Sequence, residues 1–332
     1  MIRFQGLVAH GPRVHSVAVA YTTRAVLAVA FGGPEALTVT EIDVPEPGPG
    51  QVVLDVRAAA VNPIDWKLYA PSPTADPSRL PLRLGIEVAG VVVETGPSVR
   101  WLAPGDEVVA WRVTGGYAGR IVVSEQATVR KPTALAWEPA AGLLVAGTTA
   151  VHTLTATHAG DEDVVLVHGG SGAVGRMVVQ LAELRGARVI ATASASSHDE
   201  LRALGAVPVE YGPGLAERVR AAAAGPVTVA IDTVGSDEAL DTSVELVADR
   251  SRIATIAGFR RSAELGILAL GGGPGADPGT AIREAARAQL VELAADGTLD
   301  VKVAATYPLD EAAAAHTASR AGHAQGKLIL LP

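Results

Sequence analysis

A glycine-dense turn in the middle of the chain has the residue types and spacing of a phosphate-binding loop. Residues 164–175 read VVLVHGGSGAVG. The first four are apolar and three of them are β-branched, which predicts a strand buried on both faces in a parallel sheet. Glycines without a Cβ can adopt positive φ and let backbone N–H groups approach a ligand. They stand at Gly169, Gly170, Gly172 and Gly175, so the segment predicts a phosphate site.

A helix is expected directly after this turn. From Val174 to Ala182 apolar residues recur at spacings of three and four, and Gly186 ends the pattern. The helix N-terminus would offer free N–H groups and the positive end of its dipole to a pyrophosphate. The glycine spacing fits both GxGxxG and GxxGxxG, a weak signal in a chain with 36 glycines. The order strand, turn, helix, second strand (187–192) favours a dinucleotide site over a purely structural turn.

The residues after the second strand indicate which dinucleotide binds. NAD-specific sites of this kind place an acid there to bind the ribose 2′-hydroxyl. Residues 192–197 read TASASS and contain no carboxylate that would repel a 2′-phosphate. Ser194, Ser196, Ser197 and His198 are hydrogen-bond donors available at that place. The sequence therefore predicts NADPH as the cofactor.

The elements that must position this site fall into two groups. Short strands separated by turns are expected first, at 26–31, 37–42, 51–58, 87–95, 107–112 and 120–124. Strands at 164–167, 187–192, 207–210, 227–232, 252–256 and 265–270 then alternate with helices that begin near 173, 199, 214 and 237. This alternation predicts a doubly wound parallel sheet. A helix at 281–295, another from Asp310 and a strand at 327–331 are expected to return to the first part.

Composition excludes several classes of function. The chain has 332 residues, of which 48% are hydrophobic and 4% aromatic, and a net charge of −8. Few aromatic residues and a negative charge argue against nucleic acids and anionic membranes as partners. The absence of cysteine excludes disulfides, thiolate zinc sites and cysteine nucleophiles, and is compatible with the cytoplasm, where we expect the protein. Residues 1–24 carry no signal-peptide pattern and are expected to form an extension.

Motifs along the chain resemble the medium-chain dehydrogenase/reductase superfamily, most closely its zinc-free quinone oxidoreductase branch, the zeta-crystallin-like proteins. They are FGGPEAL (31–37), VNPIDWK (61–67), LGIEVAG (84–90), PGDEV (104–108), GGYA (115–118), AGTTA (146–150), the glycine turn, YPLDEAAAAH (307–316) and GKLIL (326–330). The resemblance implies an α/β fold with a GroES-like β-barrel domain and a Rossmann domain. We assign 25–146 and 281–332 to the first and 147–280 to the second.

Departures from the zinc alcohol dehydrogenases indicate a reaction without metal. The resemblance puts Asn62 where those enzymes have a zinc-binding cysteine, and Ile86 where they have a histidine. Because isoleucine cannot bind zinc, Lewis-acid help for a simple alcohol or aldehyde is lacking. Hydride transfer to a quinone or enone needs less help, since it makes a delocalised phenolate or enolate that one hydrogen bond can stabilise.

The resemblance also implies which residues meet the cofactor. Asn62 and Thr149 would lie near the nicotinamide, and Tyr211 near the 2′-phosphate. The others are Gly170, Ser171, Gly172, Ala173, Val174 and Gly175 at the pyrophosphate, Ser236 at the ribose, and Ile256, Ala257, Gly258, Phe259, Leu268, Ala269 and Leu270 beneath the ring. Lys67 stands where zeta-crystallin has a tyrosine. Lys67 or Tyr69 is a candidate proton donor; the alternative is a solvated side chain on the rim of the cleft.

Other polar residues have structural explanations. Asp65 and Glu87 form a candidate carboxylate pair, but each is more simply read as holding loop N–H groups. Asp232 is expected to cap a turn, and His168 to act through its backbone. No histidine spacing indicates a metal site.

These observations predict an NADPH-dependent reductase of quinones or α,β-unsaturated carbonyls. An enoyl-thioester or biosynthetic enone reductase is an alternative of the same class, and a cofactor-binding sensor without turnover is one of another class. A homodimer is also expected, because family members pair sheet edges and residues 265–270 are an apolar edge strand.

Overall fold

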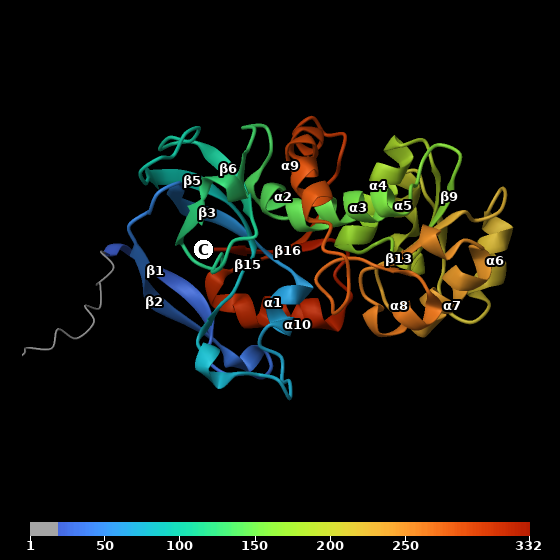
Figure 1. Cartoon of the computed structure of the whole chain (residues 1–332), viewed down its shortest axis with the longest axis horizontal. Coiled ribbons are helices and arrows are strands. Elements are labelled where there is room, and N and C mark those ends of the chain that lie inside the picture. The colour runs from blue at the N-terminus through green and yellow to red at the C-terminus, as the bar shows by residue number, and fades with distance from the viewer. Residues whose placement is uncertain (1–18) are drawn as a thin grey trace, which may run out of the picture.

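The computed structural model describes residues 19–332, which form two lobes joined by helices (Figure 1). We call the β-rich part the barrel lobe and the alternating α/β part the nucleotide lobe. Helices α3 (Leu144–Ala156) and α9 (Thr280–Ala295) lie between them. The expected boundaries at 146 and 280 fall within α3 and at the start of α9, and they remain predictions.

The nucleotide lobe is built on a six-stranded parallel sheet. The strands are β9 (Val164–His168), β10 (Arg188–Thr192), β11 (Val207–Val209), β12 (Val229–Asp232), β13 (Ile253–Thr255) and β14 (Leu268–Ala269). They lie in the order β11-β10-β9-β12-β13-β14. The chain adds β10 and β11 on one side of β9, and then β12, β13 and β14 on its other side. The point between β9 and β12 is therefore a topological switch point, where ligands of doubly wound sheets bind. The predicted sheet is confirmed.

Helices cover this sheet on both faces, as its parallel connections require. They are α4 (Ala173–Leu184), α5 (His198–Ala203), α6 (Leu215–Ala222), α7 (Asp237–Leu246) and α8 (Phe259–Leu265). The helix expected after the glycine turn is α4, and Gly186 with φ +85° stands just past its end. No helix in residues 19–332 is both long and apolar enough to cross a membrane.

The barrel lobe contains two sheets. A three-stranded sheet has β1 (Val19–Ala28) between β2 (Leu37–Pro45) and β4 (Leu82–Arg83). The larger sheet contains β3 (Gln51–Val61), β5 (Glu87–Thr95), β6 (Glu107–Trp111), β7 (Arg120–Ser124), β8 (Thr128–Arg130), β15 (Val303–Pro308) and β16 (Lys327–Leu331). Because β16 pairs antiparallel with β3, the C-terminal segment returns to the first lobe as predicted.

Short helices complete the barrel lobe: α1 (Pro63–Lys67), α2 (Trp137–Ala141) and α10 (Ala312–Ala321). Asn62 caps α1, and its backbone N–H donates to Asp65 Oδ2 at 2.8 Å. This local bond fixes the direction in which the chain leaves β3.

Strands β1 and β14 differ from the segments expected for them. β1 begins at Val19 rather than 26 because β2 supplies a pairing partner as far back as Val19 opposite Pro45, so part of the expected extension is strand; residues 1–18 lie outside the described residues. The strand expected at 265–270 is reduced to β14, since α8 continues to Leu265 and Gly266 turns with φ +66°.

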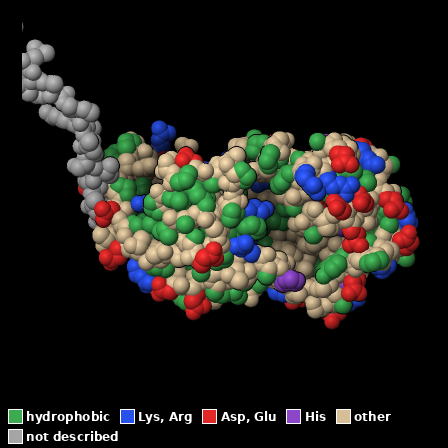
Figure 2. All heavy atoms as spheres, turned by 90° about the horizontal axis from the view of Figure 1, so that it is seen from below, with side chains coloured by type: hydrophobic (Ala, Val, Ile, Leu, Met, Phe, Trp, Pro, Cys, Tyr) green, Lys and Arg blue, Asp and Glu red, His purple; other side chains and the backbone are tan. Residues whose placement is uncertain are grey.

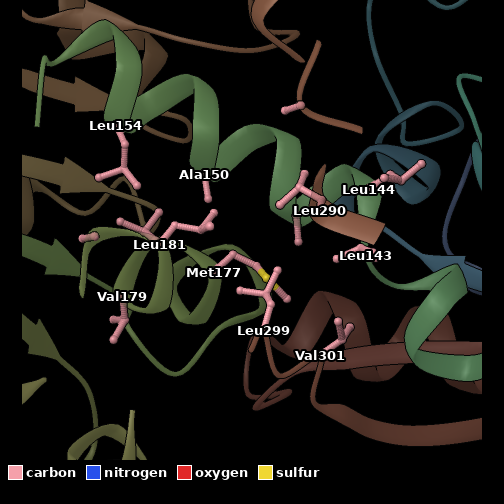
Figure 3. Close-up of a cluster of buried hydrophobic side chains, with 14 of the residues drawn as sticks. Leu143, Leu144, Ala150, Leu154, Met177, Val179, Leu181, Leu290, Leu299 and Val301 are labelled. Carbon is pink, nitrogen blue, oxygen red and sulfur yellow. The ribbon is translucent and has the colours of Figure 1, made fainter. Parts of the chain in front are cut away.

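A shared apolar core joins the two lobes (Figure 3). Leu154 and Ala150 of α3 face Met177 and Leu181 of α4, and Leu290 of α9 packs beside them. Leu290 is 1% exposed. Helix α3 is therefore held by hydrophobic contacts from both sides, which fixes the residues it contributes to the cleft.

Candidate cofactor and substrate site

A cavity of about 710 Å³ opens at the carboxyl ends of the central strands of the nucleotide lobe. Figure 2 shows a hollow between the two lobes on the face seen from below. Both lobes line the cavity, through His168, Gly169, Ser171, Gly172, Thr192, Ala193, Ser194, Ser196, Tyr211, Leu215, Thr233, Val234, Ser236, Glu238 and Ala239 of one and Gly322, His323, Ala324 and Gln325 of the other. Its position at the switch point is that of a nucleotide site.

The glycine turn forms the floor of this cavity and has the geometry expected of it. Gly169 has φ +78°, and a Cβ there would lie 2.6 Å from Val234 Cγ2. A Cβ on Gly175 would overlap the Gly169 carbonyl oxygen, so only glycine lets α4 begin so close to β9. Gly172 is the N-cap of α4, and the free N–H groups of the first turn follow it. The turn can therefore hold a pyrophosphate.

Hydroxyl and amide groups gather at the end of β10, next to the glycine turn, where Thr192 Oγ1 accepts from the Gly169 N–H at 3.1 Å. Ser194 and Ser196 follow β10, and their hydroxyls lie 3.1 Å apart. Tyr211 is 57% exposed beside them. Gln325 reaches this end from the barrel lobe, with Nε2 3.4 Å from Ser196 Oγ, and His323 lies in the same loop.

Sequence reasoning missed part of this lining. Glu238 of α7 contributes a carboxylate, which accepts a hydrogen bond from the Gly212 N–H at 3.0 Å. The loop at 322–325 follows α10, more than a hundred residues beyond β10, and no local pattern marks it. Of the cofactor residues expected, Ser171, Gly172, Ser194, Tyr211 and Ser236 line the cavity. His198 does not; its Nε2 lies 3.4 Å from the Ala193 carbonyl oxygen.

Two residues with expected structural roles have them. Asp232 Oδ1 accepts from the N–H groups of Val234 and Gly235, both at 2.9 Å. The His168 carbonyl oxygen accepts from Thr233 Oγ1 at 2.7 Å. Burial lowers the pKa of the His168 ring to about 4. Together these bonds fix the loop after β12 that lines the cavity.

A buried polar cluster surrounds Asn62, the residue expected near the nicotinamide. Lys327 Nζ donates to Asn62 Oδ1 at 2.7 Å and lies 3.2 Å from Glu87 Oε2. Glu87 Oε1 accepts from the N–H of Val145 in the first turn of α3, at 2.7 Å. In the same helix, Thr149 Oγ1 donates to the Val145 carbonyl oxygen at 2.7 Å. Glu87 thus holds a backbone N–H, but one of a helix distant in sequence and not of a neighbouring loop as expected.

A second buried cluster explains the other carboxylate and removes one candidate proton donor from the cleft. Asp65 Oδ2 accepts from Tyr117 Oη at 2.8 Å. His316 connects Tyr117 to Tyr69, whose Oη lies 2.8 Å from His316 Nδ1. Tyr69 is fully buried, and burial raises its pKa to about 12. Its hydroxyl is therefore in the core and not on the rim of a cleft.

Lys67 lies on the surface of α1, unlike Tyr69. Its side chain is exposed, and Nζ lies 5.5 Å from the centre of the Trp66 ring. The remaining residues expected at the ring, from Ile256 to Phe259 and from Leu268 to Leu270, lie after β13 and along β14 at the edge of the same sheet. They do not line the cavity described above, and their contact with a cofactor stays a prediction.

Comparison with known proteins agrees with this architecture. A family model described as the alcohol dehydrogenase GroES-like domain matches residues 48–133, and one described as zinc-binding dehydrogenase matches 204–330. Quinone oxidoreductase of Pseudomonas aeruginosa is 32% identical over 322 residues, which cover 91% of this chain and 98% of that protein. The chain belongs to the medium-chain dehydrogenase/reductase superfamily, in its zinc-free quinone oxidoreductase branch.

Solved structures of this superfamily superpose over nearly the whole chain. The quinone oxidoreductase from Coxiella burnetii has a TM-score of 0.81 with 29% identity, and covers 94% of this chain and 100% of its own. The mycobacterial protein Rv1454c complexed with NADPH also has a TM-score of 0.81, with 28% identity and 93% and 100% covered. Alignments with several other curated relatives, chloroplast quinone oxidoreductases among them, span only 56% of the relative's length.

One matching family model is described as zinc-binding dehydrogenase. Zinc does not fit the residues that stand at the expected zinc positions of this chain. The Asn62 side-chain oxygen is occupied by Lys327, whose ammonium would repel a divalent cation. Ile86 offers no ligand atom. Within residues 19–332 no three His, Asp or Glu side chains are grouped so that they could hold a metal ion.

Proposed function

We propose that this protein is an NADPH-dependent oxidoreductase that reduces quinones or α,β-unsaturated carbonyl compounds without zinc. The observation that carries this proposal is the cavity itself, in which a glycine turn at the carboxyl end of β9 faces hydroxyl groups and no carboxylate at the end of β10. The family relationship supports the same reaction class.

The residues at the end of β10 support NADPH over NADH. Ser194, Ser196 and Tyr211 offer hydroxyl donors, and His323 and Gln325 add nitrogen donors from the other lobe. A 2′-phosphate carries two negative charges and accepts several such bonds. Glu238 is the one carboxylate among the lining residues, and its bond to the Gly212 N–H directs it to the loop after β11.

The chain's contribution to the reaction is positioning. NADPH would supply the hydride. The turn from Gly169 to Gly175 would bind its pyrophosphate, and Asn62 and Thr149 would lie at the nicotinamide end. Holding cofactor and acceptor together between two lobes makes hydride transfer effectively intramolecular and keeps water out. The proton that completes the reduction can come from solvent, and Lys67 is the exposed candidate donor on α1.

Loss of NADPH absorbance with a panel of quinones and enones tests this function. We expect turnover with at least one acceptor and a higher kcat/KM for NADPH than for NADH. Ser194→Asp should lower kcat/KM for NADPH about tenfold or more and spare NADH, because a like charge beside the 2′-phosphate is unfavourable. Ser72→Asp, on an exposed loop of the barrel lobe, is the matched control. Faster turnover with NADH in the unmodified protein would overturn the cofactor assignment.

The same panel separates the alternatives. Tight NADPH binding without turnover of any acceptor would indicate a sensor. Turnover of enoyl thioesters in preference to quinones would indicate an enoyl reductase. We further propose a homodimer, because β14 is an edge strand of the nucleotide lobe's sheet, and its outer side meets the single residue Asp277 but no further strand within the described residues. A monomeric mass by light scattering would contradict this proposal.

A further inference from the structure

A buried lysine lies at the centre of the cluster around Asn62. Lys327 is 4% exposed, Glu87 0% and Asn62 2%. Taking two charges out of water costs several kcal/mol per ion, and replacing such a pair with apolar residues is often neutral or stabilising. Stability alone therefore gives no reason for this cluster, and its geometry needs another explanation.

The contact with Lys327 determines how the Asn62 amide is oriented. An ammonium group can only donate hydrogen bonds, so the amide atom 2.7 Å from Lys327 Nζ must be the oxygen. The amide nitrogen then points elsewhere. Its neighbours are the Ala60 carbonyl oxygen at 3.4 Å and Glu87 Oε2 at 3.5 Å, both long for hydrogen bonds. Both Nδ2 contacts are weak, so the amide can exchange either of them for a stronger acceptor.

Glu87 holds the lysine in this place and connects it to α3. One carboxylate oxygen lies by Lys327, and the other accepts from the Val145 N–H. Lys327 of β16 and Glu87 of β5 thus converge on one amide at the start of α1, and α3 holds Glu87 in place. A group fixed from so many sides keeps one orientation, which is what a donor to a transition state needs.

We propose that Lys327 is a positioning residue, which holds the Asn62 amide so that its Nδ2 group donates to the acceptor's carbonyl oxygen. The proposal rests on the proposed function. When hydride adds to the β-carbon of a quinone or enone, the C=C electron pair shifts to form the new double bond of the enolate or phenolate. The π electron pair of the carbonyl group then moves onto its oxygen. Asn62 would stabilise the resulting negative charge through a hydrogen bond without transferring its proton. Solvent then supplies the proton that completes the reduction.

Three variants test the proposal. Asn62→Asp keeps an oxygen for Lys327 and removes the donor, and should lower kcat about 100-fold, as removal of an oxyanion donor does. Lys327→Met frees the amide to rotate and should lower kcat about tenfold, because the productive orientation is still sampled. Lys327→Arg should recover part of this loss. NADPH affinity should change less than about twofold in the two Lys327 variants, since neither the pyrophosphate turn nor the Asn62 side chain is replaced.

Lys131→Met is the matched control for loss of a buried ion pair. Lys131 lies 2.6 Å from Glu107 Oε2 in the same lobe, and its side chain is 2% exposed. It does not contact Asn62. We expect a fall in melting temperature comparable to that of Lys327→Met, with kcat retained within about twofold. An equal loss of kcat in both variants would show that Lys327 acts only through stability and would overturn the proposal.

A thermal-unfolding cycle separates this proposal from the proposed function. If the unmodified protein reduces no acceptor, the function fails, and the contact itself is then tested with Lys327→Met, Asn62→Ala and the double variant. If the shift in melting temperature of the double variant differs strongly from the sum of the two single shifts, Lys327 and the Asn62 amide are coupled, which would support the proposal. Additive shifts would overturn it whatever the activity.

Discussion

His316 should make this protein sensitive to acid, and replacing it should remove a defined part of that sensitivity. Its ring is fully buried between Tyr69 and Tyr117. Burial, aided by the charge of Arg320, lowers its pKa from 6.5 to about 4. The folded state therefore binds fewer protons than the unfolded state wherever the pH lies between these values.

The sign and size of the effect follow from this difference. A lowered pKa contributes stability that is fully present above pH 6.5 and is lost as the pH falls through 4. Between pH 8 and pH 5 the loss from His316 is about 2 kcal/mol. His168, with its pKa also lowered to about 4, adds a similar loss. Asp65 acts in the opposite sense, because burial raises its pKa to about 6 and acid stabilises its buried form by about 1 kcal/mol over the same range.

His316→Gln isolates one of these contributions. Glutamine can accept from Tyr69 and donate to Tyr117, as the ring does, but it does not titrate. In urea unfolding, the free energy of unfolding should fall between pH 8 and pH 5 by about 2 kcal/mol less in the variant than in the unmodified protein. His323→Gln, on an exposed loop, controls for removal of a histidine. Equal losses in the unmodified protein and His316→Gln would refute the reasoning, because the buried ring would then carry no pH dependence.

Three further changes have defined outcomes. Gly175→Ala should weaken NADPH binding more than about tenfold in a fluorescence titration, since its Cβ meets the Gly169 carbonyl oxygen, whereas Gly160→Ala, with no atom within 4 Å, should not. Leu290→Ala should lower the free energy of unfolding by about 2–5 kcal/mol in urea, because it opens a cavity in the core shared by the lobes. Between pH 8 and pH 5 the free energy of unfolding of Asp65→Asn should fall by about 1 kcal/mol more than that of the unmodified protein. An equal fall in both proteins would refute the role of Asp65 burial.

Features encoded by neighbouring residues could be predicted from the sequence. The glycine turn, α4 and the parallel sheet follow from patterns within about thirty residues. Strand β16 was expected at 327–331 and lies there. The start of β1 at Val19 was not predicted, because it depends on pairing with Pro45 in β2 and not on the residues of β1 alone.

Contacts between distant parts of the chain could not be predicted in the same way. The loop with His323 and Gln325 reaches the cavity only because β16 returns to β3. Tyr69, expected as a proton donor or a solvated side chain on the rim because it lies near Lys67, is buried, and His316 of α10 offers its hydroxyl a partner. A tyrosine whose hydroxyl is satisfied can enter a core, and only the tertiary structure shows that partner.

The register of β16 against β3 decides whether Lys327 reaches Asn62. Leu328 pairs with Val61 and Ile329 with Ala60, so the antiparallel register brings Lys327 opposite Asn62. A slip by one residue would turn every side chain of β16 to the other face and bring Leu328 there instead. The buried apolar residues Leu328, Ile329 and Leu330 oppose such a slip. The hydrophobic packing of the last strand is therefore what places a lysine, 265 residues away in sequence, beside an amide that no local motif connects to it.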